Sequence, residues 1–178
     1  MVKSENKGDT AVYDSPLGRI LIKSRNGHIT GLGFCKEDIV VSEHTEPVID
    51  EAMKWLDTYF SGKNPGPVPP LELTGTPFRM KVWDILRTIP YGTTTTYGEI
   101  AKTIAEERGL QRMSAQAVGN AVGSNPIAII IPCHRVIGSD GSLVGYAFGT
   151  NIKSKLLSLE GIETHYRGLH PSGPQVIP

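Results

Sequence analysis

Residues 127–135 read IAIIIPCHR, an apolar run that three reactive side chains follow without a gap. Four isoleucines and one alanine in close succession are typical of a strand that is buried on both faces. A proline then ends the strand, and Gly138 shortly afterwards favours a turn. The stretch therefore predicts a buried strand that delivers Cys133, His134 and Arg135 to one place in the fold.

Cys133 is the candidate nucleophile of this stretch. A thiolate attacks carbon far better than a thiol does, and neighbouring imidazole and guanidinium groups can lower the pKa of a cysteine from about 8.5. Adjacent side chains of a strand point to opposite faces, so Cys133 and His134 can cooperate only across a turn or through a water molecule. On spacing alone, a buried structural cysteine beside a surface histidine remains an alternative.

A glutamate further along the chain favours the catalytic interpretation. Residues 151–160 form a predicted helix that a glycine closes, and Ile152, Leu156 and Glu160 lie four apart along its apolar stripe. Glu160 is thereby expected to face the core at the negative end of the helix dipole, where a carboxylate is disfavoured twice. His134 is the obvious buried partner. The result would be a Cys, His, Glu constellation in which the histidine is the base and the glutamate orients it.

The first part of the chain is expected to be a small sheet with one helix. Apolar and polar residues alternate over 11–13, 19–23 and 28–34, with the turn sequences SPLG at 15–18 and NG at 26–27 between these runs. This alternation is typical of short strands joined by hairpins. Apolar residues at helical spacing over 52–60, followed by Gly62 where a helix cap belongs, predict a helix that covers the sheet.

A proline-rich segment divides the chain. Four of the seven residues at 64–70 are proline, which favours an extended connector and a domain boundary. We therefore expect one domain at 1–73, a second at 74–163 and a tail at 164–178. Residues 1–72 carry 8 basic and 11 acidic side chains, whereas the remainder carries 10 and 7. The second part is mildly basic, which is a weak indication of nucleic-acid binding.

The second domain is expected to be mainly helical. Thr76 and Pro77 fit the cap and first position of a helix that PYG at 90–92 ends, and residues 97–105 and 114–122 read as two further short helices. Two helices joined in this way resemble a helix-turn-helix, an arrangement that is common and unspecific. The helix at 114–122 is rich in alanine and glycine, and Gly119 within it costs about 0.5–1 kcal/mol. Either tight packing on a neighbouring helix or close approach to a DNA groove would explain this glycine.

Composition excludes several classes of protein. The chain has 178 residues, of which 39% are hydrophobic and 20% charged, as in an ordinary globular protein. Its first ten residues are polar, and its longest apolar run is far too short to span a bilayer, so we expect no membrane partner. The two cysteines form no CxxC pair, and no cluster has metal-ligand spacing, so neither a disulfide nor a metal is expected. A reducing cytoplasm fits best.

Four short segments together carry a family resemblance. They are GSNP at 123–126, IPCHRVIG at 131–138, GY at 145–146 and LSLEG at 157–161. In these segments the chain resembles the O6-alkylguanine-DNA alkyltransferases, also called methylated-DNA-protein-cysteine methyltransferases. The resemblance is strong over 74–161 and general before it. It implies an α/β N-terminal domain of ribonuclease-H-like topology and a mainly α, winged-helix-like C-terminal domain that binds the DNA minor groove through the helix at 114–122.

The resemblance also implies a reaction. A monomer without cofactor would bind duplex DNA, flip out an O6-alkylguanine and transfer its alkyl group irreversibly to Cys133, once per molecule; O4-alkylthymine stays open as a second substrate. His134 would act as the base through a water, with Glu160 as its partner. Asn125 would brace the active-site turn. Tyr97, which without the family would be read as a core or capping residue, would help to rotate the nucleotide and protonate guanine at N3.

Further residues follow from the same resemblance. The base pocket would be lined by Val136, Tyr146, Ala147 and Phe148, and DNA would be contacted by Tyr97, Arg112, Ala115, Gln116, Gly119 and Arg135. Two positions depart from the family pattern. Gln116 stands where many relatives have an arginine that fills the gap left by the flipped base, and either Arg112 or no residue takes the place of that arginine. Phe148 stands where many have glycine, and it is expected to narrow the pocket against bulky adducts such as benzyl.

Three other functions remain to be weighed. A non-catalytic relative that only binds the lesion would lack the acceptor cysteine, which is present here. A winged-helix regulator that uses the cysteine as a sensor would carry an added effector domain. A cysteine hydrolase would turn over many times and would not need a DNA-binding helix.

Overall fold

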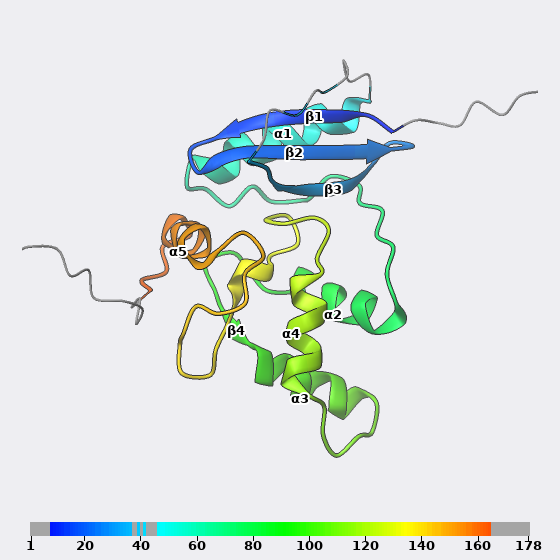
Figure 1. The fold of residues 1–178 in the computed structure, drawn as a ribbon, viewed down its shortest axis with the longest axis vertical. Helices are drawn as coiled ribbons and strands as arrows, with labels where there is room; N and C mark the ends of the chain where they lie inside the picture. The colour runs from blue at the N-terminus through cyan, green and yellow to red at the C-terminus, as the bar shows by residue number, and fades with distance from the viewer. Residues whose placement is uncertain (1–7, 37–38, 40, 42–45, 165–178) are drawn as a thin grey trace, which may run out of the picture.

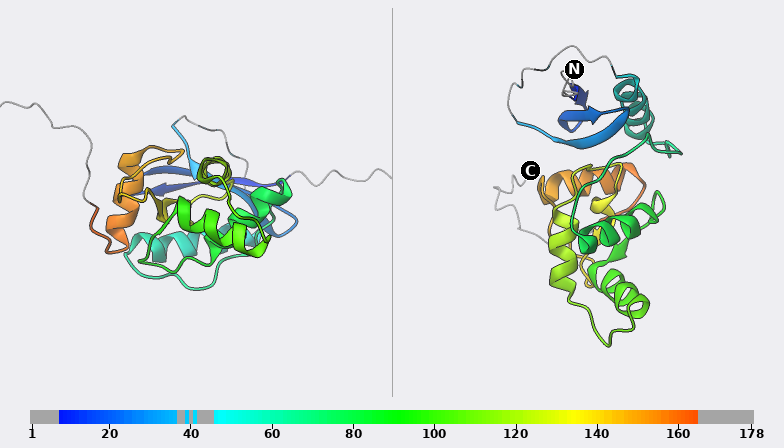
Figure 2. Two further views of the ribbon diagram at one scale, coloured as in Figure 1. Left: turned by 90° about the horizontal axis from the view of Figure 1, so that it is seen from below. Right: turned by 90° about the vertical axis from the view of Figure 1, so that its right-hand side faces the viewer.

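The computed structural model describes residues 8–36, 39, 41 and 46–164, and it consists of a sheet unit above a helical body (Figure 1). Apart from Thr164, the tail expected at 164–178 lies outside the described residues. The right-hand view in Figure 2 shows the same division, with the sheet and its helix above and the remaining helices below. The expected combination of an N-terminal sheet domain and a helical C-terminal domain is confirmed.

The N-terminal sheet is an antiparallel meander of β1 (Thr10–Ser15), β2 (Gly18–Arg25) and β3 (His28–Phe34). The register places Ala11 opposite Ile22, and Ile22 opposite Leu32, so that these buried side chains share one face. Asn26 and Gly27 join β2 to β3 with φ values of 51° and 74°. Positive φ at both positions is what the tightest hairpin turn requires, and the predicted Asn-Gly turn is confirmed.

Helix α1 (Pro47–Phe60) covers one face of this sheet (Figures 1 and 2). Its buried side chains recur at helical spacing and are Val48, Ile49, Ala52, Trp55, Leu56 and Tyr59. Gly62 lies just beyond the helix with a φ of 78°, as expected for a terminating glycine. The proline-rich connector then runs along β3, where Ile29 N–H donates to Pro70 O at 2.8 Å and Glu72 N–H donates to Ile29 O at 2.9 Å.

The C-terminal domain is built from four helices and a short parallel strand pair. The helices are α2 (Pro77–Arg87), α3 (Tyr97–Glu107), α4 (Ala115–Gly123) and α5 (Thr150–Leu159), and the strands are β4 (Thr95–Thr96) and β5 (Val136–Ile137). Side-chain caps fix three helix starts: Thr76 accepts from Arg79 N–H, Thr96 forms a capping box with Glu99, and Ser114 accepts from Ala117 N–H. Sequence reasoning therefore placed α2, α3 and α4 to within about two residues.

The strand predicted over 127–131 is wrong, although all five residues are buried. Leu32 N–H of β3 donates to Pro126 O at 3.0 Å, and Ala128 N–H donates back to Leu32 O at 2.8 Å. The chain then turns at Ile129, which has a φ of 70°, and Ile131 N–H donates to Ile127 O. Burial selects isoleucine whatever the backbone does, so a buried turn and a buried strand have the same composition. These hydrogen bonds attach the segment that leads into Cys133 to β3, the edge strand of the N-terminal sheet.

Candidate active site

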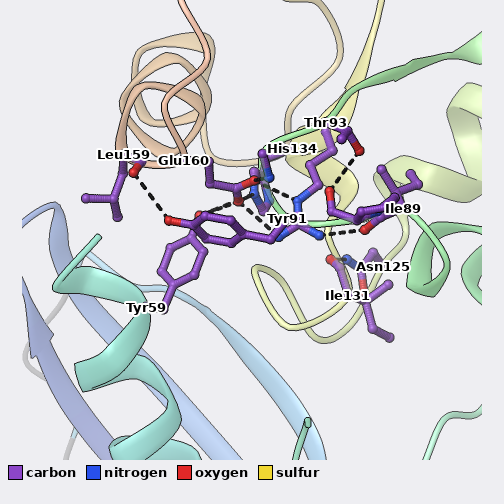
Figure 3. A network of polar contacts seen from close by, with 12 residues as sticks. Tyr59, Ile89, Tyr91, Thr93, Asn125, Ile131, His134, Leu159 and Glu160 are labelled. Carbon is purple, nitrogen blue, oxygen red and sulfur yellow. Dashed lines mark hydrogen bonds and ion pairs between the residues drawn. The ribbon is translucent and has the colours of Figure 1, made fainter. Parts of the chain in front are cut away.

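Cys133, His134 and Arg135 form one turn of 3-10 helix, η1 (Cys133–Arg135), between the buried turn and β5. All three side chains are buried, Cys133 with 5% and His134 with 0% of its surface exposed. A helical turn directs successive side chains around an axis and not to opposite faces, so the obstacle that a strand would have posed is removed. Figure 3 shows the polar network around this turn.

The Glu160 carboxylate is the centre of that network. Its Oε1 accepts from His134 Nε2 at 2.6 Å and from the Tyr59 hydroxyl at 2.8 Å. Its Oε2 accepts from Arg135 Nε at 2.8 Å and from Gly92 N–H at 3.0 Å. Burial alone would raise the pKa of this carboxyl, but the hydrogen bonds from His134 and Arg135 outweigh it and lower the pKa to about 2. Glu160 is therefore a buried anion at neutral pH, just beyond the last residue of α5.

His134 is held in one tautomer by this contact. Glu160 is ionised and accepts only, so His134 carries its proton on Nε2. Nδ1 is buried and has no hydrogen-bond partner among the described residues. Burial lowers the pKa of the imidazole, while the hydrogen bond and charge of Glu160 oppose that shift. The ring is thus a neutral base with one lone pair free for a water molecule.

The Cys133 thiol is protonated in this environment. Burial raises its pKa, while a hydrogen bond from the Asn125 side chain and the charge of Lys153 act in the opposite direction. The Arg135 guanidinium, a group of the kind that can lower this pKa, hydrogen-bonds Glu160 and donates to Ile89 O at 2.7 Å. Arg135 is only 7% exposed, and this placement speaks against the DNA contact predicted for it.

The Asn125 side chain hydrogen-bonds the backbone at both ends of the buried turn that precedes Cys133. Its Nδ2 donates to Ile131 O at 2.8 Å, and its Oδ1 accepts from Ile127 N–H at 3.0 Å. The backbone N–H of Asn125 donates to Val122 O in the last turn of α4. One amide side chain therefore closes the buried turn directly after α4.

Lys153 is a site residue that sequence reasoning missed. It is fully buried on α5 and donates from Nζ to Val136 O and, at 2.8 Å, to Val144 O. Burial lowers the pKa of Lys153 to about 8, and the adjacent Cys133 works against that shift. A signal was available: a lysine at position 153 lies three and seven residues before Leu156 and Glu160, on the apolar stripe of the predicted helix.

Tyr97 stands at the first position of α3, facing the loop before α5. Its hydroxyl donates to Val144 O at 2.9 Å, and burial raises its pKa to about 12, so the phenol stays protonated. Of the predicted pocket residues, Val136 and Tyr146 are buried and Ala147 is exposed. The Tyr146 hydroxyl is buried with no partner among the described residues. Burial and, to a smaller extent, Cys133 raise the pKa of this phenol.

The start of α4 presents the predicted DNA-contact residues to the surface. Arg112, Ala115 and Gln116 are exposed, and Gly119 is half-buried. A methyl group added at Gly119 would meet the Tyr97 ring at 3.8 Å, an ordinary contact. Tight packing therefore does not require glycine at this position, which favours the alternative of close approach from outside.

Together these features define a two-domain protein built around a buried nucleophilic thiol with a histidine–carboxylate pair. The chain belongs to the 6-O-methylguanine DNA methyltransferase family. The family model of the ribonuclease-like domain matches residues 10–68, and that of the DNA binding domain matches residues 77–162. The resemblance drawn from the four motifs is confirmed.

Individual relatives agree with this assignment. The chain is 43% identical over 156 residues to a methylated-DNA–protein-cysteine methyltransferase of Methanosarcina acetivorans, covering 85% of this chain and 97% of the relative. Among solved structures, it is similar to the O6-methylguanine methyltransferase of Mycobacterium tuberculosis, with a TM-score of 0.74, 38% identity and coverage of 86% and 93% of the two chains. The Mycobacterium tuberculosis protein in complex with DNA matches with a TM-score of 0.72 and 41% identity over 84% and 90%.

In the described ranges, no group of three or more histidine, cysteine or acidic side chains could hold a metal ion. Cys35 and Cys133 are both free thiols. No helix in the same part of the chain is long and apolar enough to cross a membrane.

Proposed function

We propose that this protein repairs alkylated DNA by transferring the alkyl group of O6-alkylguanine to its own Cys133. The observation that carries this proposal is the 2.6 Å contact between His134 Nε2 and the ionised Glu160, which leaves Nδ1 of a neutral imidazole, in the residue that follows the buried, protonated Cys133, without a partner among the described residues. Relatives at about 40% identity are methylated-DNA–protein-cysteine methyltransferases, and a similar structure holds DNA.

The proposed reaction is one displacement at carbon. His134 takes the Cys133 proton through a water, and the thiolate attacks the alkyl carbon. The S–C bond forms as the C–O6 bond breaks, and the bonding electron pair goes to the guanine. Tyr97, which is protonated at neutral pH, supplies a proton at N3 of the leaving base. Lys153 and Asn125 favour the thiolate.

The proposed DNA surface is α4 with the turn before it. A stacked base cannot present O6 to a thiol that is 5% exposed, so the nucleotide has to leave the duplex. Gln116 would fill the gap, with Arg112, Ala115 and Gly119 at the groove, and Val136, Tyr146, Ala147 and Phe148 around the extruded base. We further propose that the C-terminal part is a winged-helix-like domain at 74–163 and that residues 1–73 have ribonuclease-H-like topology.

The decisive test is intact-mass spectrometry after incubation with an O6-methylguanine duplex. We expect a gain of one methyl group, mapped to Cys133, with no further gain after one equivalent, because nothing in the site removes a thioether. Cys133→Ala should gain nothing, and Cys35→Ala should react as the parent does. Label on Cys35, or guanine release beyond one equivalent, would overturn the proposal and favour a hydrolase or a sensor.

A further inference from the structure

Tyr59 belongs to the N-terminal domain but hydrogen-bonds the active site of the other domain. It lies in the last turn of α1, and its side chain points from that helix toward Glu160 and His134 (Figure 3). The hydroxyl oxygen lies 2.8 Å from Glu160 Oε1 and 3.3 Å from His134 Nε2. The sequence predicted this residue only as part of an apolar helix face.

The Tyr59 ring is fixed by its neighbours. It is fully buried, it stacks on Trp55 with centroids 5.6 Å apart and planes at 5°, and it meets the edges of Phe60 and Tyr91. Burial and the nearby Glu160 charge raise the pKa of the phenol, so the hydroxyl keeps its proton. Since His134 Nε2 also carries a proton, the Tyr59 hydroxyl donates to Glu160.

Three donors therefore share one carboxylate oxygen. Glu160 Oε1 accepts from Tyr59, from His134 and, at 3.1 Å, from a terminal guanidinium nitrogen of Arg135. A donor from α1 restricts rotation of the carboxylate and takes up part of its negative charge. Glu160 therefore stabilises the protonated imidazole of His134 less than an unshared carboxylate would, and His134 stays a weaker base.

We propose that Tyr59 is a positioning residue for alkyl transfer: by hydrogen-bonding Glu160 from the N-terminal domain, it sets the orientation and basicity of His134, so that thiol activation depends on the docking of the two domains. This inference rests on the proposed transfer to Cys133. It assigns the N-terminal domain a part in the chemistry, in addition to its packing.

Among the described residues, the charged and titratable groups that act on His134 come from identified elements. Glu160 and Lys153 come from α5 and its cap, Arg135 from η1, and Tyr59 from α1. Tyr59→Phe keeps the ring and its aromatic contacts and removes only the hydroxyl. Any change in the titration of His134 in this variant then reports the lost hydrogen bond.

The experiment compares Tyr59→Phe with Tyr13→Phe. Tyr13 offers a matched control, because its hydroxyl donates to the Asp57 carboxylate at 2.7 Å on the outer part of the same domain. Two quantities are measured on the full chain: the rate of methyl transfer from an O6-methylguanine duplex as a function of pH, and the NMR titration of the His134 ring in unreacted protein, assigned with His134→Gln. Thermal melting is recorded for each variant.

For Tyr59→Phe we expect transfer at neutral pH to slow about tenfold, the size of one charge-assisted hydrogen bond, because the Glu160 carboxylate is less restrained and a larger share of His134 is protonated. The acid limb of the rate profile and the His134 titration should both move to higher pH, while Tyr13→Phe matches the parent. Lower melting temperature with an unchanged titration and profile would overturn the inference and leave Tyr59 a packing residue. Absence of methyl uptake by the parent protein would instead overturn the proposed function, and the His134 titration would still decide the role of Tyr59.

Discussion

Phe148, in the loop before α5, packs edge to face on Phe34 of β3, with ring centroids 5.5 Å apart. The same ring also meets the Tyr146 ring, with centroids 5.7 Å apart. Gly33 accommodates the contact, because a methyl group there would lie 2.8 Å from the Phe148 ring. The Phe148 ring thus contacts both the N-terminal sheet and Tyr146, a residue of the proposed base pocket. The two domains therefore meet at the wall of that pocket.

This contact leads to a prediction about adduct size. Phe148→Ala removes a ring that supports Tyr146, so the pocket should admit a larger group. We expect the rate with O6-benzylguanine to rise about tenfold relative to O6-methylguanine, the usual effect of opening an apolar pocket by a few carbon atoms. Competition between the two free bases measures this ratio. Phe34→Leu is the control that loosens the contact without emptying position 148, and an unchanged ratio in Phe148→Ala would mean that the ring never limits the pocket.

Local signals in the sequence predicted most elements of the fold. The Asn26-Gly27 turn, the Thr76 cap and the apolar stripe of α1 each depend on a few neighbouring residues, and each is found as predicted. The strand expected at 127–131 failed because its pairing partner is the edge of β3, roughly a hundred residues earlier. The composition of a segment indicates that it is buried, but it does not indicate which distant backbone groups form hydrogen bonds with its N–H and C=O groups.

The site was predictable to the extent that its residues break a local pattern. Glu160 on an apolar stripe required a buried partner, and His134 lies 2.6 Å away. Lys153 breaks the same stripe, so the same kind of signal marks it as a buried residue that needs partners. Tyr59 does not depart from the local pattern, because a tyrosine on a buried helix face is common. Its hydroxyl meets Glu160 only through the docking of two domains, which no local pattern encodes.

Lys153 provides a prediction about the thiol itself. Lys153→Met keeps the length of the side chain but removes a buried cation that favours the Cys133 thiolate. We expect the pH midpoint of Cys133 alkylation by iodoacetamide to move upward and repair of duplex DNA to slow about tenfold. Lys155→Met, an exposed change on the same helix, is the control and should leave both quantities at parent values. Identical alkylation profiles for the two variants would show that Lys153 does not contribute to activation of the Cys133 thiol.

Glu160→Gln should separate chemistry from DNA binding. The amide cannot hold the His134 proton as a carboxylate does, so we expect transfer to slow about 100-fold, the usual contribution of an oriented base. Affinity for an unmodified duplex, measured by fluorescence anisotropy, should stay within about twofold, because the residue is only 6% exposed and its hydrogen bonds go to α1, η1 and the Gly92 backbone. Glu163→Gln, on the exposed chain just beyond, is the matched control. Parallel loss of affinity and rate would make Glu160 a purely structural residue.

The same carboxylate should govern stability in acid. Its pKa in the folded protein is about 2, against about 4.5 for the ordinary group, so the folded state holds the ionised form more tightly than the unfolded state does. The stabilisation is complete above about pH 4.5 and is lost as the pH falls toward 2, with a total of up to about 3 kcal/mol. Urea unfolding of the parent and of Glu160→Gln should converge across this window. A difference in unfolding free energy that is constant from pH 6 to 3 would contradict the lowered pKa.

Gln116 is exposed in the first turn of α4, at the position where the family resemblance places a gap-filling arginine in many relatives. An arginine there would insert a planar cation and gain from the phosphate potential. Glutamine fills space and hydrogen-bonds but carries no charge. Duplex binding by this protein should therefore depend less on position 116 than it does in those relatives.

Gln116→Arg should raise the affinity for an O6-methylguanine duplex and steepen the salt dependence by at most about one unit of slope, because one cation is added. Reaction with free O6-methylguanine base should not change, since no base has to leave a stack. In Gln116→Ala, duplex repair should fall while the free-base reaction persists. If Gln116→Ala repairs duplex DNA at the parent rate, glutamine does not fill the gap, and Arg112, exposed three residues before α4, becomes the residue to replace next.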